Sequence, residues 1–245
     1  MRNKRQNPVT KQLLSVSDQN APFNYVEAYK MLCTNFEFIT TANDCKNIMI
    51  TSTLANEGKT NVAVNLARAL AGYNKKVCLV ECDFRRPTVD KLVFRSNHME
   101  GLTDVLKGER DLPKAIRRVE ETTMHLLPAG TIPPNPSELL SSEKMKDVID
   151  RLSSVYDYII YDTPPVLLVT DAATLGRYMD GAVFVVRHNQ TERNLVLKAK
   201  KNLDTAGVKV LGAVYSMFNE KAAGSYYNYQ SYDYYYDSRS TQEKR

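Results

Sequence analysis

The sequence predicts an α/β fold built on a doubly wound, mostly parallel β-sheet. Apolar, β-branched runs typical of buried parallel strands alternate with segments whose apolar residues recur at helical spacing. Strands and helices that alternate in this way form parallel sheets through right-handed crossovers. The chain has 245 residues, 43% of them hydrophobic, which is enough for the core of one large domain. We expect that domain over residues 23–219, between a flexible basic arm (1–22) and a C-terminal tail (220–245).

The first predicted element is a helix over residues 25–39, followed by a strand over 47–51. The residues Gly58, Lys59 and Thr60 then lead into a helix that ends near residue 73. A second strand covers 75–83 and carries acidic residues where it ends. The sequence Arg85-Arg86-Pro87 breaks this strand into a loop.

Short helices are expected over 101–107 and 112–119, before a strand that ends near Gly130. The segment IPPNPSELL is a proline-stiffened loop in which Pro136 and Ser137 begin a helix. The remaining elements are a helix over 142–154, a strand ending at Asp162, a helix near 171–178, a strand over 182–186, a helix over 192–206 and a strand over 209–217.

The loop between the first strand and its helix has the chemistry of a phosphate-binding loop. Backbone N–H groups at a helix start, together with the helix dipole, hold polyphosphate. Lys59 would reach the β- and γ-phosphates of a nucleotide, and the Thr60 hydroxyl would ligate magnesium. The pattern G-x-x-x-x-G-K-[ST] is imperfect, because Thr53 holds the first glycine position. The alternative is a fortuitous Gly-Lys-Thr. We expect nucleotide contacts from residues of the loop and helix start: Asn56, Glu57, Gly58, Lys59, Thr60 and Asn61.

Three acidic residues are predicted at the same edge of the sheet. Glu81 and Asp83 end the second strand, and Asp162 ends the strand YDYIIYD in a Walker B pattern. The carboxyl ends of parallel strands face the ligand crevice of an open α/β sheet. Each acid alone could be a solvated loop residue. Together with a phosphate loop they favour phosphoryl transfer, which needs positioning, magnesium and electrostatic stabilisation.

Composition bounds the location and partners of the chain. It has no apolar run long enough to span a membrane and no signal-peptide core, so we expect a cytosolic protein. The four cysteines lack C-x-x-C or metal-site spacing and are expected to be reduced structural thiols: Cys33, Cys45, Cys78 and Cys82. The net charge of +5 is modest and no basic run is interleaved with aromatics, so nucleic-acid binding is not expected.

The C-terminal segment beyond Phe218 differs sharply in composition. GSYYNYQSYDYYYDSRSTQEKR has no aliphatic residue after its glycine and is predicted to be disordered. It contains seven tyrosines: Tyr226, Tyr227, Tyr229, Tyr232, Tyr234, Tyr235 and Tyr236. Without other information it could be a sticky low-complexity end. Beside a phosphoryl-transfer site, it is a set of candidate phosphate acceptors.

From about Glu27 onward the sequence resembles the bacterial tyrosine kinases that regulate capsular and exopolysaccharide synthesis. The resemblance rests on residues 26–38, 51–67, 77–87, 100–109, 126–142, 156–172 and the tyrosine cluster. PPNPSELL together with a terminal tyrosine cluster is more specific than the Walker motifs, which the cell-division-site and plasmid-partition ATPases share. The chain is most similar to the stand-alone cytoplasmic form, whose membrane-spanning activator is a separate chain.

This resemblance implies ATP and Mg²⁺ as cofactors, bound by Lys59 and Thr60. It implies that Asp83 and Asp162 support the metal and that Glu81 accepts the proton of the tyrosine hydroxyl. It also implies a membrane-spanning polysaccharide co-polymerase as activator, a cognate phosphatase, and a peripheral location at the inner face of the plasma membrane. The tail tyrosines would be phosphorylated between subunits.

The sequence departs from the family pattern at several positions. Glu81 replaces the first aspartate of Asp-x-Asp-x-Arg, and Ala55-Asn56 replaces Pro-Gly in the phosphate loop. The family's oligomer helix carries Glu-x-x-Arg-x-x-Arg, where this chain has Glu27, Lys30 and Cys33. Oligomer contacts are therefore assigned to Glu27 and Lys30.

Two alternatives to an autokinase stay open: a nucleotide-dependent switch or scaffold with weak or no transfer, and a positioning ATPase of the partition type.

Overall fold

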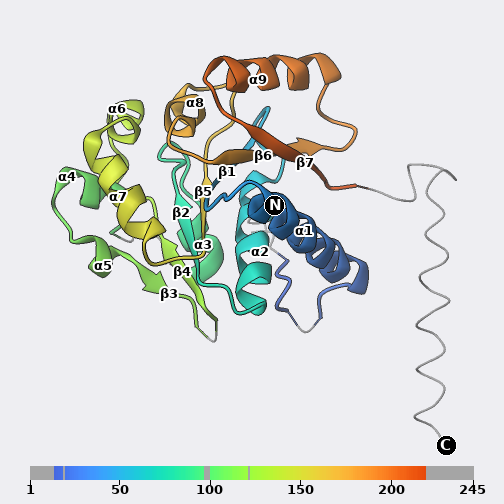
Figure 1. Ribbon diagram of the computed structural model, residues 1–245, viewed down its shortest axis with the longest axis horizontal. Helices are drawn as coiled ribbons and strands as arrows, with labels where there is room; N and C mark the ends of the chain where they lie inside the picture. The colour runs from blue at the N-terminus through green and yellow to red at the C-terminus, as the bar shows by residue number, and fades with distance from the viewer. Residues whose placement is uncertain (1–13, 19, 97–99, 121, 219–245) are drawn as a thin grey trace, which may run out of the picture.

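The computed structural model describes residues 14–218, apart from 19, 97–99 and 121. In these residues one sheet of seven strands has the order β3-β4-β2-β5-β1-β6-β7 (Figure 1). The strands are β1 (Asn47–Ser52), β2 (Val77–Glu81), β3 (Arg117–Arg118), β4 (Met124–Leu127), β5 (Tyr158–Asp162), β6 (Gly181–Arg187) and β7 (Val210–Ser216). All neighbouring strands are parallel except β3, which pairs antiparallel to β4. The predicted fold class is confirmed.

Helices cover both faces of the sheet, as a doubly wound fold requires (Figure 1). The helices are α1 (Phe23–Ala42), α2 (Lys59–Gly72), α3 (Val89–Phe94), α4 (Leu102–Lys107), α5 (Leu112–Ala115), α6 (Pro136–Leu140), α7 (Glu143–Ser153), α8 (Asp171–Gly176) and α9 (Arg193–Thr205). Ile48 and Ile50 of β1 pack with α1, α2 and α3, whereas Met49 packs with α8 and α9 on the other face. Every residue of β1, β2 and β5 is buried, which explains their continuous apolar runs.

Two predicted elements are corrected by the structure. The helix predicted over 112–119 ends at Ala115, because Ile116 is extended and Arg117–Arg118 pair with β4 as a short edge strand. A two-residue strand has no periodicity to reveal it. The loop predicted after Asp83 contains α3, which sequence analysis did not expect, and β2 itself ends at Glu81, so Asp83 lies in the loop.

Part of the predicted N-terminal arm is packed against the domain. Ser15 is buried, and its hydroxyl accepts a hydrogen bond of 2.6 Å from Arg68 of α2. The backbone N–H of Val16 donates to Asn65 Oδ1 at 2.9 Å. Ser15 and Val16, which lie within the arm predicted over residues 1–22, thus contact α2. Residues 1–13 and the seven tail tyrosines lie outside the described residues.

All four cysteines are buried free thiols, as predicted, and burial raises the pKa of the Cys33 thiol to about 11. Among the described helices, none has both the length and the apolar character to cross a bilayer.

Gly101 packs closely against the backbone of Pro128 and Gly130, and this contact gives the first testable prediction. A Cβ at Gly101 would lie 2.1 Å from the carbonyl oxygen of Pro128, a backbone atom that cannot move independently. Gly101→Ala should lower the free energy of unfolding by about 1–3 kcal/mol, measured by urea denaturation. Gly72, at the end of α2, is the matched control, since its Cβ would meet nothing within 4 Å. Gly72→Ala should leave stability unchanged or raise it by up to about 1 kcal/mol. A Gly101→Ala protein as stable as the wild type would contradict the predicted clash.

Candidate active site

The phosphate loop connects β1 to α2 through two residues with left-handed backbone conformation. Asn56 has a φ of 64° and Gly58 has a φ of 87°. Asparagine is among the few non-glycine residues that accept this conformation readily, so Asn56 can replace the family glycine. The first N–H groups of α2 have no acceptor within the helix, and α2 begins at Lys59. The loop thus presents a helix start suited to an anion.

The loop is braced from the ends of β6 and β7. The Glu57 side chain is buried, and its carboxylate accepts hydrogen bonds from the Leu54 N–H at 2.9 Å and from the Thr191 hydroxyl. The Ser216 hydroxyl donates to the Glu57 carbonyl at 2.5 Å. Arg187 donates to the Asn56 carbonyl at 2.9 Å. The Glu57 carboxylate is therefore occupied inside the loop, and the Ser216 hydroxyl holds the loop backbone.

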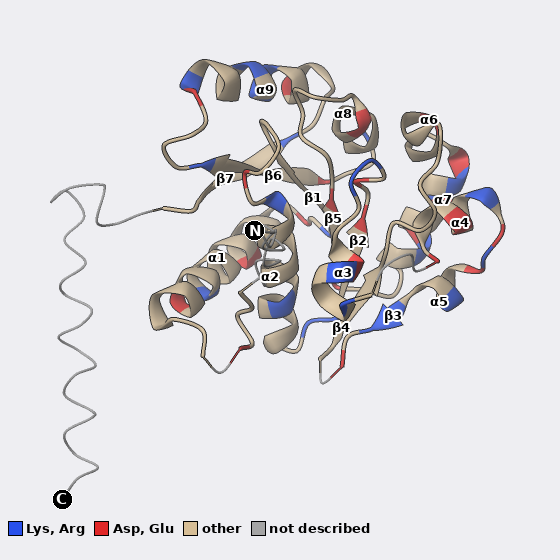
Figure 2. Cartoon of the chain, turned by 180° about the vertical axis from the view of Figure 1, so that it is seen from behind, with Lys and Arg blue, Asp and Glu red and all other residues tan. Residues whose placement is uncertain are grey.

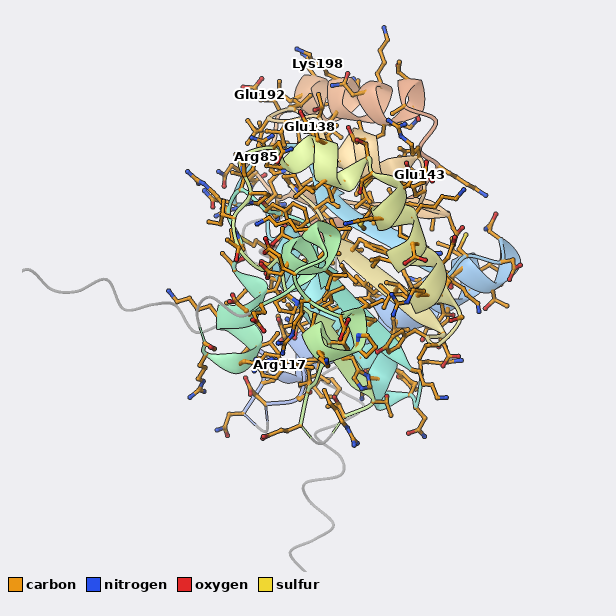
Figure 3. All side chains as sticks on the ribbon, turned by 90° about the vertical axis from the view of Figure 1, so that its left-hand side faces the viewer. Arg85, Arg117, Glu138, Glu143, Glu192 and Lys198 are labelled. Carbon is orange, nitrogen blue, oxygen red and sulfur yellow. The ribbon has the colours of Figure 1, made fainter. Side chains whose placement is uncertain are left out.

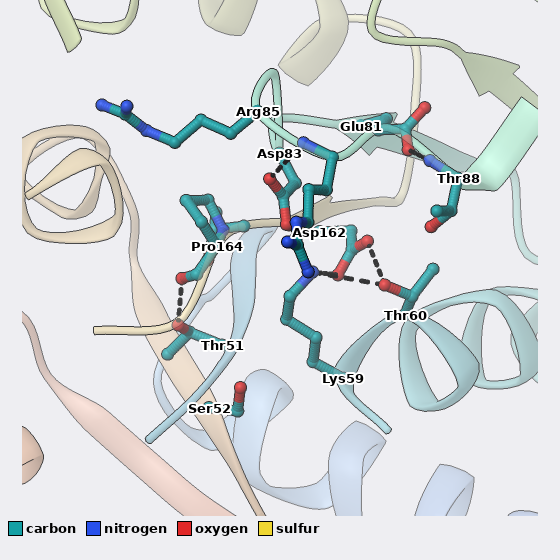
Figure 4. A network of polar contacts seen from close by, with 12 residues as sticks. Thr51, Ser52, Lys59, Thr60, Glu81, Asp83, Arg85, Thr88, Asp162 and Pro164 are labelled. Atoms are coloured by element: carbon teal, nitrogen blue, oxygen red, sulfur yellow. Dashed lines mark hydrogen bonds and ion pairs between the residues drawn. The ribbon is translucent and has the colours of Figure 1, made fainter. Parts of the chain in front are cut away.

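Lys59, Thr60, Asp83 and Asp162 form one polar cluster (Figure 4). Lys59 Nζ lies 3.0 Å from Asp83 Oδ2 and 3.4 Å from Asp162 Oδ1. The Thr60 hydroxyl donates to Asp162 Oδ2 at 2.7 Å. Figure 2 shows the acidic residues where β2 and β5 end and a basic residue at the start of α2. The structure thus brings these four predicted site residues together.

Burial and charge act in opposite directions in this cluster. Burial raises the pKa of the Asp162 carboxyl, although Lys59 and Thr60 partly offset this effect. Burial lowers the pKa of Lys59, but the attraction of Asp162 and Asp83 outweighs burial and leaves that pKa raised. The ammonium therefore stays charged and neutralises the two carboxylates.

Two carboxylates and a hydroxyl are oxygen ligands of the type that magnesium prefers, and they converge where a phosphate loop would place a nucleotide. The donor set fits the metal assignment of Thr60, Asp83 and Asp162. No described cluster contains three or more His, Cys, Asp or Glu side chains able to hold a metal. Phosphate and water oxygens would therefore complete the coordination.

Glu81 lies beside this cluster, but its carboxylate contacts the start of α3. Oε1 accepts hydrogen bonds from the N–H groups of Thr88 and Val89, the latter at 2.8 Å, and Oε2 lies 3.4 Å from the Ala129 nitrogen. Figure 4 shows Glu81 turned toward Thr88 and away from Lys59. Burial raises the pKa of the Glu81 carboxyl to about 8, against the effect of the two backbone donors.

Asn61 faces α1. Its Oδ1 atom accepts a hydrogen bond from the Tyr29 hydroxyl at 2.7 Å and lies 3.3 Å from the Tyr25 hydroxyl. Asn65, one turn along α2, lies beside it at 3.2 Å. This side chain joins α1 to α2, so a nucleotide contact from Asn61 would come from its backbone.

Glu27 and Lys30 lie on the exposed surface of α1, one turn apart. Their side chains form an ion pair of 2.7 Å within the helix. Because both side chains are about half exposed, the pair contributes little to stability. Their role as oligomer contacts stays a prediction.

A parallel sheet with a Gly-Lys-Thr loop between β1 and α2, and an aspartate at the end of β5, defines a phosphate-loop nucleotide-binding protein. Known proteins agree with this class. The family described as AAA domain matches residues 45–192. The solved structure of the septum site-determining protein MinD complexed with Mg-ADP, from Pyrococcus horikoshii, is 26% identical with a TM-score of 0.60, covering 73% of this chain and 75% of that chain.

More specific matches are tyrosine kinases. The chain is 42% identical over 188 residues to tyrosine-protein kinase YwqD of Bacillus subtilis, and the match covers 77% of this chain and 79% of that relative. The kinase domain of the Escherichia coli tyrosine kinase ETK is 32% identical with a TM-score of 0.74, covering 79% of this chain and 77% of that chain. The chain belongs to the bacterial tyrosine kinases, as the motif resemblance predicted.

Several contacts that hold the site were not predicted from the sequence. Arg187 and Thr191 brace the phosphate loop, and Asn65 joins its helix to α1. Arg85 holds the arginine position of the family pattern Asp-x-Asp-x-Arg, but its partner was not predicted: it forms a two-point ion pair with Asp171 of α8. Of the three residues outside the motifs, only Asn65 carries a local signal, because it lies four residues after Asn61 on the same face of α2.

Thr191 provides a test of the brace. Thr191→Val has nearly the same shape but removes the hydroxyl that donates to the buried Glu57 carboxylate. The loss should lower the free energy of unfolding by about 1–3 kcal/mol, because a buried acceptor loses a partner. Thr191→Ser keeps the hydroxyl and should unfold at nearly the wild-type urea concentration. Equal stability of the valine and serine proteins would show that this hydrogen bond does not hold the loop.

Proposed function

We propose that this tyrosine kinase is an ATP-dependent autokinase that phosphorylates its own C-terminal tyrosine cluster between subunits. One observation carries the proposal: Lys59 and Thr60 of the phosphate loop converge with Asp83 and Asp162 on one point. Such a cluster provides the positive charge and oxygen ligands that phosphoryl transfer requires. The MinD structure with Mg-ADP supports nucleotide and magnesium binding at a loop of this kind.

Each residue of the cluster has a role in this proposal. The first N–H groups of α2 would bind phosphate oxygens, and Lys59 would turn from the carboxylates to the β- and γ-phosphates. Thr60, Asp83 and Asp162 would hold Mg²⁺, which when bound stabilises negative charge on the transferring phosphoryl group. The buried position of Asp162 keeps water away from its ion pair and strengthens the electrostatic contacts.

Glu81 is the proposed acceptor of the tyrosine proton. Burial raises its pKa to about 8, closer to the ordinary pKa of tyrosine near ~10, so proton transfer becomes less unfavourable. Oε1 is held by two backbone N–H groups, whereas Oε2 has a single long contact of 3.4 Å. Oε2 is therefore the oxygen proposed to receive the proton, after local movement gives it access to the substrate.

The tail is connected to the domain beside the phosphate loop. The strand β7 ends at Ser216, whose hydroxyl contacts Glu57 of that loop. About seventeen residues separate Asn219 from Tyr236, and a flexible chain of that length spans roughly 20–25 Å. The seven tyrosines are the proposed acceptors. Each phosphate adds about −1.5 to −2 charges at neutral pH, so modification would make tails in one assembly repel each other.

Biologically, the proposed autokinase regulates capsular or exopolysaccharide synthesis. Its proposed partners are a membrane-spanning polysaccharide co-polymerase that activates it and a cognate phosphatase that resets it. The activator would hold it at the inner face of the plasma membrane. Self-association through α1 would rely on Glu27 and Lys30, a weak, salt-sensitive pair, so the raised local concentration at the activator would favour transfer.

A second function is favoured by one specific observation. The Glu81 carboxylate is buried and engaged with α3 in this conformation, so a base is not presented to a substrate. A nucleotide-dependent switch or scaffold of the export machinery, with weak or no transfer, fits that arrangement.

Autophosphorylation is tested with two variants of the full chain. Lys59→Met, incubated with ATP and Mg²⁺, should lose at least about 100-fold of its transfer rate, because it lacks the phosphate-binding ammonium. A protein with all seven tail tyrosines replaced by Phe should keep ATP binding but lose most of its phosphate. Phosphotyrosine is mapped by mass spectrometry, with and without activator segments, and thermal unfolding controls for folding.

Mixing the two variants tests transfer between subunits. The Lys59→Met chain offers tyrosines without catalysis, and the seven-Phe chain offers catalysis without tail acceptors. Phosphate should appear on the tail of the Lys59→Met chain. Wild-type chains that modify themselves while the mixture stays unmodified would contradict transfer between subunits. Wild-type chains that bind ATP without any transfer would favour the switch.

The proton acceptor is tested at position 81. Glu81→Gln keeps an oxygen able to accept from Thr88 and Val89 but cannot take a proton. Its transfer rate should fall about 100-fold, with ATP affinity within about twofold of the wild type. Glu81→Asp restores the family carboxylate and should retain more activity than Glu81→Gln. Unchanged turnover in Glu81→Gln would transfer the role to Asp83.

A further inference from the structure

The loop of residues 82–88, between β2 and α3, determines where Asp83 lies. At the end of the loop, Glu81 accepts hydrogen bonds from Thr88 and Val89. Near its start, Asp83 Oδ1 accepts a hydrogen bond from the Arg86 N–H at 3.1 Å, while Oδ2 pairs with Lys59. The position of the Asp83 carboxylate therefore depends on the turn that contains Arg85 and Arg86.

Arg85 attaches this turn to α8. Its Nε donates to Asp171 Oδ2 at 2.8 Å, and its Nη2 donates to Asp171 Oδ1 at 3.1 Å. Figure 4 shows the Arg85 side chain extending away from Lys59, so the guanidinium is directed outside the cluster. Two parallel charge-assisted hydrogen bonds fix both the distance and the orientation of the arginine.

The two partners of this ion pair differ in burial. The Asp171 side chain is fully buried, whereas the Arg85 side chain is 43% exposed. A buried carboxylate without a cation is costly, so Asp171 strongly favours conformations in which Arg85 reaches it. The pair is therefore unlike the exposed pairs on the helices, whose partners are free to separate.

The IPPNPSELL segment provides a third contact. Ser137, the second residue of α6, donates its hydroxyl to Asp171 Oδ1 at 2.5 Å. Tyr178, which follows α8, donates to the Ser141 carbonyl just after α6 at 3.3 Å. Figure 3 shows Arg85 and Glu138 of α6 on the side of the molecule that faces the viewer. A motif far from the phosphate loop in sequence is thus attached to the loop that carries Asp83.

We propose that Asp171 is a positioning residue of the kinase site. Through Arg85 it holds loop 82–88 so that Asp83 faces Lys59, and Ser137 orients its carboxylate for that contact. The Arg85–Asp171–Ser137 group, called here the loop clasp, gives the PPNPSELL segment a role in the site. The consequence for catalysis depends on the proposed function of Asp83 in metal support, but the contacts themselves do not.

The contacts are tested by hydrogen exchange on the full chain without nucleotide. In Arg85→Gln and Asp171→Asn, the amide hydrogens of residues 82–86, 88 and 89 should exchange about tenfold faster than in the wild type, because the loop opens more often. Glu100→Gln is the matched control, since it breaks another Arg–carboxylate pair, Arg110–Glu100 at 3.0 Å, outside the clasp. In Glu100→Gln, the amide hydrogens of loop 82–88 should exchange at the wild-type rate.

The catalytic consequence is tested by titrating Mg²⁺ in the tail phosphorylation assay. Asp171→Asn and Arg85→Gln should each raise the half-saturating Mg²⁺ concentration about tenfold. This is the lower end of the roughly 10- to 100-fold loss of metal affinity that is typical when a residue supporting a metal ligand is changed. At saturating Mg²⁺ the KM for ATP should stay within about twofold, because the phosphate loop is intact. Ser137→Ala should show a smaller shift, and Ser137→Thr, which keeps the hydroxyl, should restore the wild-type value. The double variant Arg85→Gln/Asp171→Asn should need no more Mg²⁺ for half-saturation than Arg85→Gln alone, because both changes break the same contact.

Hydrogen exchange tests the contacts of the loop clasp, and the Mg²⁺ titration tests their effect on the proposed kinase activity, so the two proposals can fail independently. If the wild type transfers no phosphate, the autokinase proposal fails, while the exchange of residues 82–89 still decides the clasp. Unchanged loop exchange in Arg85→Gln would overturn the proposal. So would a uniform acceleration over the whole chain in Asp171→Asn without a loop-specific effect in Arg85→Gln. An unaltered Mg²⁺ requirement in a wild type that is active would overturn the positioning role.

Discussion

The ion pairs of Lys59 with Asp83 and Asp162 are the interaction on which the site depends. Parallel strands bring acidic residues to one edge of the sheet, where burial and mutual repulsion disfavour their charged forms. The Lys59 ammonium lies within 3.0 and 3.4 Å of the two carboxylates and makes their proximity tolerable. The residue proposed to bind phosphate therefore also neutralises the acids proposed to support the metal. If Lys59 turns to phosphate as proposed, the carboxylates need another cation, so the proposed nucleotide and metal binding would be physically coupled.

The sequence predicted the positions of those site residues that follow from the direction of a parallel strand. An apolar parallel strand predicts its own burial and also predicts that its carboxyl end faces the crevice. This rule placed Asp162 and the Gly58-Lys59-Thr60 loop correctly. Asparagine is also one of the residue types that accept the positive φ found at Asn56. Asp83 reached the site although β2 ends two residues earlier, because the adjacent loop turns back toward Lys59.

The remaining features depend on contacts between distant segments, which local patterns do not encode. The Thr191–Glu57 and Arg85–Asp171 contacts join residues that are 134 and 86 positions apart. α3 was missed because Arg-Arg-Pro is typical of a loop, while the acceptor for its first N–H groups is Glu81 from β2. The separations here are only seven and eight residues, but a helix of six residues that depends on a carboxylate outside it leaves little trace in sequence periodicity.

Under the proposed function, structural and catalytic demands compete for the Glu81 side chain. A longer arm than aspartate allows its carboxylate to contact the start of α3, and this contact holds the end of the loop that carries Asp83. A base acting on tyrosine needs an accessible oxygen, whereas an acceptor for buried N–H groups needs an inaccessible one. If α3 moves when the tail binds, Glu81 gains access only as the loop loses an anchor. The Arg85–Asp171 pair then becomes the contact that keeps Asp83 in place.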